Sequence, residues 1–103
     1  MAEEMALNLT VSAEQVAELC RRHRIRELSL FGSAARNELR PESDIDLLVE
    51  FFPEAKVSLI GHLAAESEFA ALFGRRVDLV SKRAIREPLR QEILPQARLL
   101  YAA

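Results

Sequence analysis

The sequence predicts a single α+β domain in which helices and strands alternate and pack in layers. The chain has 103 residues, a length that fits one compact domain. Half of these residues are hydrophobic, which is enough to build one core. Segments with helical periodicity alternate along the chain with segments of strand periodicity, and such an alternation is typical of layered sheet-and-helix folds. We therefore expect one domain over residues 1–103.

The first half of the chain predicts a helix, a strand, a short helix and a second strand. Ser12 and Gln15 form a capping-box pattern, in which the serine accepts a hydrogen bond from the backbone N–H three residues later. Alternation around Leu28 and Leu30 indicates a strand that ends at Gly32. The expected bounds of these four elements are 13–24, 26–31, 33–39 and 44–51.

The second half of the chain also predicts a helix, a strand, a helix and a strand, in that order. Ser58 can cap a third helix that Gly74 ends, and its apolar stripe contains Leu59, Leu63, Phe69, Leu72 and Phe73. Residues 76–80 form a third expected strand, and Pro88 suits the first turn of a fourth helix. A last strand is expected over 97–101. The sequence contains no internal repeat or low-complexity tract.

Composition excludes several classes of function. Lys and Arg number 14 against 16 Asp and Glu, so the net charge of -2 gives no general attraction to nucleic acid or to an anionic membrane. The apolar runs are far shorter than the roughly 20 residues needed to cross a bilayer. The acidic N-terminus lacks the pattern of a secretory signal. The single cysteine, Cys20, lies in an amphipathic helix and is expected to be a core residue. We expect a cytoplasmic protein.

Three aspartates form the first candidate site. Side chains alternate across a strand, so Asp44 and Asp46 project from the same face while the aliphatic residues between and after them project from the other. Asp78 has the same arrangement in the third expected strand. If these two strands are neighbours, three carboxylates gather, repel one another and favour a compensating cation. Magnesium prefers such oxygen ligands and supports phosphoryl transfer.

The simpler interpretation of these aspartates is a solvated strand face, or a salt bridge from Asp78 to Arg75 or Arg76. No single one of the three acids separates the two interpretations. Their combination favours nucleotide chemistry.

A second candidate site lies where the first strand meets the short helix. Gly32 permits close approach of the backbone, Ser33 can donate to a phosphate oxygen, and Arg36 lies about one helical turn later. Neither the G-x-x-x-x-G-K-[ST] nor the G-x-G-x-x-G loop is present. For a lone Gly-Ser, a tight turn with a serine cap is the better explanation.

Together, Gly32-Ser33, ten intervening residues and Asp44-Ile-Asp46 match the G-S-x10-D-x-D signature of the nucleotidyltransferase superfamily related to DNA polymerase beta. The segments Leu-Phe-Gly-Ser-Ala-Ala-Arg36 and Arg40-Pro-Glu-Ser-Asp-Ile-Asp-Leu-Leu-Val49 resemble the minimal nucleotidyltransferases, abbreviated MNT. The resemblance covers about residues 12–101, which we take as the core of the domain.

This resemblance implies a nucleotidyltransferase fold with a mixed sheet of three to four strands and helices packed mainly on one face. It implies that Asp44, Asp46 and Asp78 are catalytic and hold two magnesium ions, with Asp78 also acting as the base. Gly32 and Ser33 would bind the phosphates of ATP, assisted by Arg36.

The resemblance also implies a partner, because the chain has no second domain to hold an acceptor. Minimal relatives resemble the antitoxins of HEPN/MNT pairs, which attach AMP from ATP to a tyrosine of the HEPN toxin, so a hetero-oligomer is expected. Two alternatives remain open from the sequence. One is a non-catalytic antitoxin that neutralises its partner by binding; the other is a nucleotidyltransferase acting on a small molecule or RNA with another subunit.

Overall fold

The computed structural model describes residues 11–36, 38, 40 and 42–103, and it confirms all eight expected elements in their expected order. The helices are α1 (Ala13–Arg22), α2 (Gly32–Ala35), α3 (Leu59–Phe73) and α4 (Leu89–Ile93). The strands are β1 (Ile25–Phe31), β2 (Ile45–Phe51), β3 (Val77–Ser81) and β4 (Arg98–Ala102). Short 3₁₀ turns follow β3 (η2, Lys82–Ala84) and α4 (η3, Leu94–Gln96).

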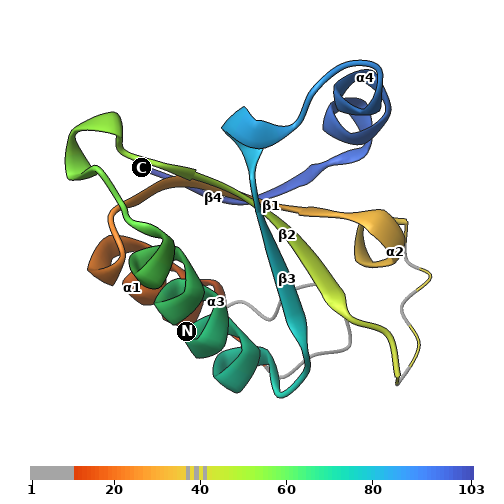
Figure 1. The fold of residues 1–103 in the computed structure, drawn as a ribbon. Coiled ribbons are helices and arrows are strands. Elements are labelled where there is room, and N and C mark those ends of the chain that lie inside the picture. The colour runs from red at the N-terminus through yellow and green to blue at the C-terminus, as the bar shows by residue number, and fades with distance from the viewer. Residues whose placement is uncertain (1–10, 37, 39, 41) are drawn as a thin grey trace.

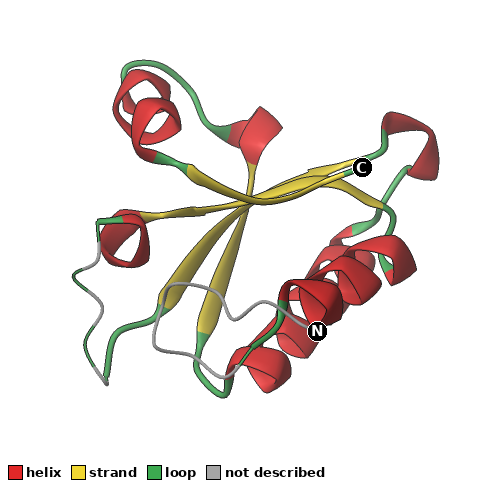
Figure 2. Cartoon of the chain, turned by 180° about the vertical axis from the view of Figure 1, so that it is seen from behind, coloured by secondary structure: helices red, strands yellow, loops and turns green. Residues whose placement is uncertain are grey.

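The four strands form one mixed sheet in the order β3-β2-β1-β4. β1 runs antiparallel to both β2 and β4, whereas β3 runs parallel to β2. Helices α1 and α3 lie together against one face of the sheet, and α4 lies on the other side (Figures 1 and 2). This is the predicted mixed sheet with its main helices on one face. The other face, here called the open face, carries the polar side chains of β1, β2 and β3.

Strand alternation explains which face is buried. Leu28 and Leu30 of β1 and Ile45, Leu47 and Val49 of β2 are at most 1% exposed, because they point toward α1 and α3. Burying a side chain of this size contributes about 1.5–3 kcal/mol relative to leaving it in water. The helices supply the other half of the core, with fully or almost fully buried Val16, Leu19, Cys20, Ala65, Phe69 and Phe73.

Cys20 behaves as the core residue that the sequence predicts. Its side chain is fully buried, and this burial raises the pKa of the thiol to about 12. A thiol with that pKa stays protonated near neutral pH and is a poor nucleophile.

The helix ends confirm the predicted caps and correct two bounds. Ser12 and Gln15 form both hydrogen bonds of the capping box, and the Ser58 side chain accepts from the N–H of Gly61. Gly74 ends α3 in the left-handed conformation with φ 68°. However, α1 ends at Arg22 rather than at residue 24, and α2 is much shorter than the expected 33–39.

The predicted apolar stripe of α3 was wrong at one end. Phe69 and Phe73 are buried as expected, but Leu59 is 74% exposed and Leu63 is 51% exposed. This helix carries apolar residues around most of its circumference, so its sequence does not determine which face packs on the sheet.

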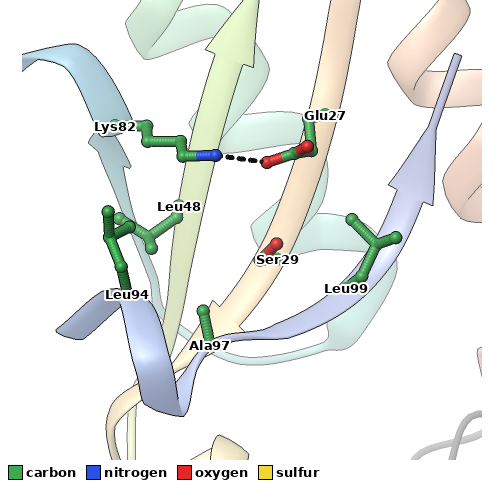
Figure 3. A pocket seen from close by; sticks show the side chains of 7 residues that line it. All are labelled: Glu27, Ser29, Leu48, Lys82, Leu94, Ala97 and Leu99. Carbon is green, nitrogen blue, oxygen red and sulfur yellow. Dashed lines mark hydrogen bonds and ion pairs between the residues drawn. The ribbon is translucent and has the colours of Figure 1, made fainter.

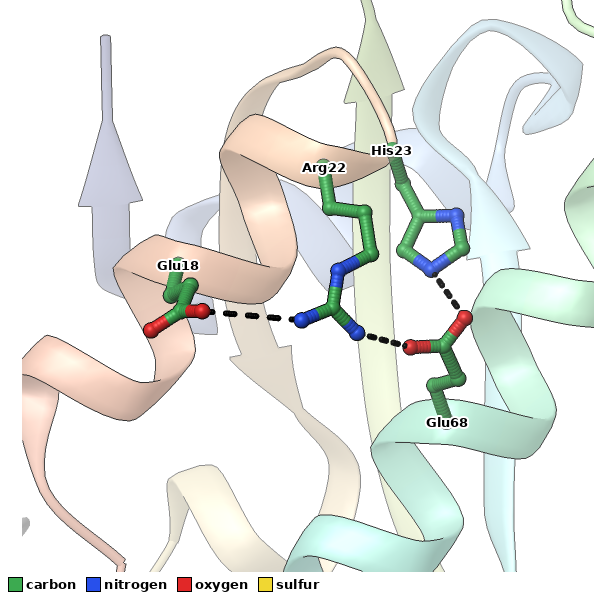
Figure 4. Close-up of polar contacts among 4 residues, drawn as sticks. All are labelled: Glu18, Arg22, His23 and Glu68. Carbon is green, nitrogen blue, oxygen red and sulfur yellow. Dashed lines mark hydrogen bonds and ion pairs between the residues drawn. The ribbon is translucent and has the colours of Figure 1, made fainter.

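A polar network links α1 to α3 at the surface (Figure 4). Glu68 accepts from Arg22 at 2.7 Å and contacts His23 at 2.8 Å, while Glu18 pairs with Arg22 at 3.5 Å. The hydrogen bond from Arg22 is the main reason that the pKa of Glu68 is lowered from its ordinary value. Because Glu18 and Arg22 are more than half exposed, we expect the network to orient the two helices more than to stabilise them.

Within the part of the chain that the structure describes, none of the helices combines the length and hydrophobicity needed to cross a membrane.

Candidate active site

The predicted site residues meet at one end of the sheet. The last residue of β1, Phe31, pairs with Asp46 of β2, and Asp46 in turn pairs with Asp78 of β3. Gly32 follows Phe31 directly and begins α2. Strand pairing therefore places the Gly-Ser turn, Asp46 and Asp78 side by side, although they are far apart in the sequence.

The aspartates differ in exposure and in electrostatic environment. Asp46 is half-buried, whereas Asp44 and Asp78 are exposed. Burial raises the pKa of Asp46 above its ordinary value, and the negative charges of Asp78 and Asp44 raise it further, while Arg36 opposes them. Both neighbouring acids thus act on Asp46, as expected for a gathered anionic site.

The donor chemistry of this site fits a hard divalent cation, since carboxylate oxygens are the ligands that Mg²⁺ prefers. Among the described residues, however, there is no group of three or more His, Cys, Asp or Glu side chains already arranged to hold a metal ion. The predicted cluster is therefore only partly assembled: Asp46 and Asp78 occupy paired positions, and Asp44 lies at the edge.

Gly32 packs directly against the acidic site. Its φ is +68°, a conformation that residues with a Cβ rarely adopt, and a Cβ added there would collide with the Asp46 carboxylate. A larger residue fits here only if the Asp46 carboxylate moves. This close approach explains why the Gly-Ser turn and Asp46 act as one unit.

The helix after this turn is shorter than the sequence predicts. α2 ends at Ala35, and Arg36 forms its C-cap with its N–H bonded to the carbonyls of Gly32 and Ser33. Residues 37 and 39 of the expected helix lie outside the described residues. A helix of one turn has only a small macrodipole. Any affinity for an anion at this turn therefore depends on the backbone N–H groups that lack intrahelical partners and on the Ser33 hydroxyl.

Arg36 lies close enough to the acids to affect them. Its charge is among the causes that act on the pKa of Asp46, and it lowers that pKa. Its side chain is 48% exposed and donates to Glu38 at 2.9 Å. This exposed arginine can exchange Glu38 for another anion at little cost.

The comparisons with known proteins identify the family. The sequence profile described as "Polymerase beta, Nucleotidyltransferase" matches residues 14–103. The chain belongs to this family. It is 36% identical over 92 residues to the protein adenylyltransferase MntA of Thermococcus cleftensis, covering 89% of this chain and 88% of that protein.

Two solved structures share the nucleotidyltransferase fold. A candidate minimal nucleotidyltransferase is 40% identical with a TM-score of 0.72, and the match covers 82% of this chain and 85% of that one. A chain from the complex of a tri-AMPylated Shewanella oneidensis HEPN toxin with its MNT antitoxin is 22% identical with a TM-score of 0.65. That match covers 88% of this chain and 70% of the other, and at this identity it shows the fold alone.

Two residues of α3 that the sequence does not single out hold the strand of Asp78 in this nucleotidyltransferase. Glu66 accepts the backbone N–H of Leu79 at 2.8 Å, and the His62 ring donates to the carbonyl of Leu79 at 2.7 Å. β3 is an edge strand, so both groups would otherwise lack a partner in the sheet. The pair therefore fixes the residue next to Asp78. Its only sequence signal is two polar residues four apart in an apolar helix.

Arg75 has a similar role on the other side of the acids. The sequence offers Arg75 and Arg76 as salt-bridge partners of Asp78, but Arg75 instead donates to the carbonyls of Arg40 at 2.6 Å and of Ser43 at 3.2 Å. These carbonyls belong to the segment that enters β2 through Asp44. Arg75 thus positions the first acid of the nucleotidyltransferase motif through the backbone.

Proposed function

We propose that this nucleotidyltransferase transfers AMP from ATP to a protein hydroxyl, a tyrosine of a HEPN-type toxin, and thereby acts as its antitoxin. The observation that carries the proposal is the contact of Gly32 with Asp46, with Asp78 paired beside it. This contact makes a phosphate-binding turn continuous with the acids, which is the arrangement that nucleotidyl transfer requires.

Each residue has a defined task in this reaction. The N–H groups of the Gly32–Ser33 turn bind the β- and γ-phosphates and so orient the α-phosphate toward the acids. Asp78 accepts the proton of the incoming hydroxyl. The hydroxyl oxygen forms a bond to the α-phosphorus, the bond from this phosphorus to the bridging oxygen breaks, and pyrophosphate leaves. Arg36 neutralises part of the charge on the phosphates.

Asp44, Asp46 and Asp78 would hold magnesium in this site. When bound, two such ions supply the charge neutralisation that an in-line displacement at phosphorus needs. The pKa shift of Asp46 supports this assignment, because an acid whose charge is disfavoured by its neighbours gains most from a cation.

A protein acceptor fits the relatives of this domain. The nearly full-length match to a protein adenylyltransferase supports a protein substrate. The proposed class of partner is taken from the solved complex of a HEPN toxin with an MNT antitoxin, one chain of which has this fold. A hetero-oligomer in the cytoplasm, where ATP is available, is the setting that we propose.

We expect ATP with magnesium to raise the melting temperature of the isolated protein, and ATP with EDTA to raise it much less. A ligand that binds only the native state adds RT ln(1 + [L]/Kd) to the unfolding free energy, which is about 2.7 kcal/mol at 100 Kd. Differential scanning fluorimetry measures both shifts. Equal shifts with and without the chelator would show that ATP binds without a metal ion and would contradict the metal part of the proposed site.

A further inference from the structure

A second feature of the open face is a pocket that β2, the strand of Asp46, helps to line (Figure 3). It has a volume of about 220 Å³ and lies between the sheet and the chain around η3. Its lining residues are Glu27, Ser29, Leu48, Lys82, Leu94, Ala97 and Leu99.

Strand register gives the offset of this pocket from Asp46 along the strands. Leu48 lies two residues after Asp46 on the same face of β2, and its partner Ser29 lies two residues before Phe31 on β1. Two residues of a strand span about 7 Å. The pocket floor is therefore about one tyrosine side chain away from the level of Asp46.

The walls of the pocket combine an apolar slot with polar groups. Leu48, Leu94, Ala97 and Leu99 form the apolar part. Ser29 is the buried polar residue of the described chain, 8% exposed. Lys82 and Glu27 close the polar end with an ion pair at 2.7 Å. This mixture of apolar and polar walls suits a ring that carries a polar atom.

The direction of the displacement indicates which group would occupy this pocket. The Gly32–Ser33 turn, the level of Asp46 and the level of Ser29 follow one another along the strands. An in-line displacement needs the entering oxygen on the side of the phosphorus opposite the leaving pyrophosphate. With the pyrophosphate at the Gly-Ser turn, the entering side faces the pocket.

We propose that this pocket is the acceptor subsite and that it receives the aromatic ring of the acceptor tyrosine, with the phenol oxygen directed toward Asp46 and Asp78. The inference rests on the proposed function and adds the place of the acceptor. In the step, the phenol loses its proton to Asp78, its oxygen bonds to the α-phosphorus of ATP, and pyrophosphate departs. The products are tyrosyl-AMP ester and pyrophosphate.

Leu99→Glu and Leu99→Trp test this subsite, because one introduces a charge into the pocket and the other fills it. Leu99 is 61% exposed, so both variants should fold. Leu89→Glu is the matched control, since Leu89 is 52% exposed on the neighbouring α4 but does not line the pocket. Each protein is incubated with its HEPN partner, ATP and magnesium, and the AMP-modified partner is quantified by mass spectrometry.

We expect both Leu99 variants to transfer AMP at least about tenfold more slowly than the wild type, the effect of losing one well-placed contact. Their thermal shift with ATP and magnesium should match that of the wild type, and Leu89→Glu should transfer normally. Normal transfer by the Leu99 variants would overturn the proposal. So would an equal loss in Leu89→Glu, or a parallel loss of the ATP shift, which would make the pocket a site for the nucleotide base. A wild-type protein that transfers no AMP would instead refute the proposed function.

Discussion

Asp46→Asn should abolish nucleotidyl transfer while leaving the folded domain at least as stable as the wild type without ligand. Asp46 contacts Gly32 and pairs with Asp78, so in the proposed reaction its charge is central to binding the metal-bound triphosphate. Removing one electrostatic group of this kind typically costs about 10²–10³ in rate. The partner's AMP content, measured over time by mass spectrometry, gives the size of the loss.

The stability part of this result follows from the direction of the pKa shift. The folded protein raises the pKa of Asp46, so it holds the proton more tightly than the unfolded chain does. The unfolding free energy therefore falls as pH rises from the unfolded pKa of about 3.9 through the raised folded value. Asn carries no such charge. The increase in unfolding free energy that Asp46→Asn causes should therefore be present at neutral pH and vanish in acid. Urea unfolding at several pH values measures it. A variant that is several kcal/mol less stable at neutral pH would mark Asp46 as structural.

Gly32→Ala should have the second large effect, on transfer more than on folding. The added methyl group would occupy the space of the Asp46 carboxylate, which must then move. A displacement of about 1 Å at a reacting centre can cost about 10²-fold in rate. We expect a loss of at least this size, together with a weaker thermal shift from ATP and magnesium.

Gly74→Ala provides the control for this substitution. Gly74 also has φ +68°, but a Cβ added there meets nothing within 4 Å. Both variants therefore carry the left-handed backbone strain, about 1–2 kcal/mol for a residue with a Cβ, and only Gly32→Ala adds the collision with Asp46. If the two variants lose transfer equally, strain or instability explains the loss and the contact with Asp46 does not.

Local patterns in the sequence were sufficient to predict the elements and to propose the residues of the site. Capping residues such as Ser12 and Ser58 make their bonds with the next turn, so they act at short range and can be recognised without a structure. The alternation in β2 separates its aspartates from the aliphatic residues that are buried in the core. The motif from Gly32 to Asp46 depends on residues that lie within one short segment.

Features that depend on distant contacts could not be predicted in this way. The pairing of Asp78 with Asp46 requires β3 to lie beside β2, which the sequence leaves conditional. The support of β3 by Glu66 and His62 joins side chains of a helix to a strand edge and has no periodic signal. The packing face of α3 could not be predicted either, because a helix that is apolar on most sides does not specify which side packs on the sheet. Leu59 was expected to be buried and is exposed.

The mass of the HEPN partner after incubation with this protein, ATP and magnesium tests the central claim most directly. We expect an increase of about 329 Da for each AMP group, on a tyrosine of the partner. Asp78→Asn should retain some ATP binding but lose most of this increase, since the base acts on the incoming hydroxyl. The claim is contradicted if the wild type neutralises the toxin without changing its mass and Asp78→Asn neutralises it equally well, because simple binding would then account for the antitoxin effect.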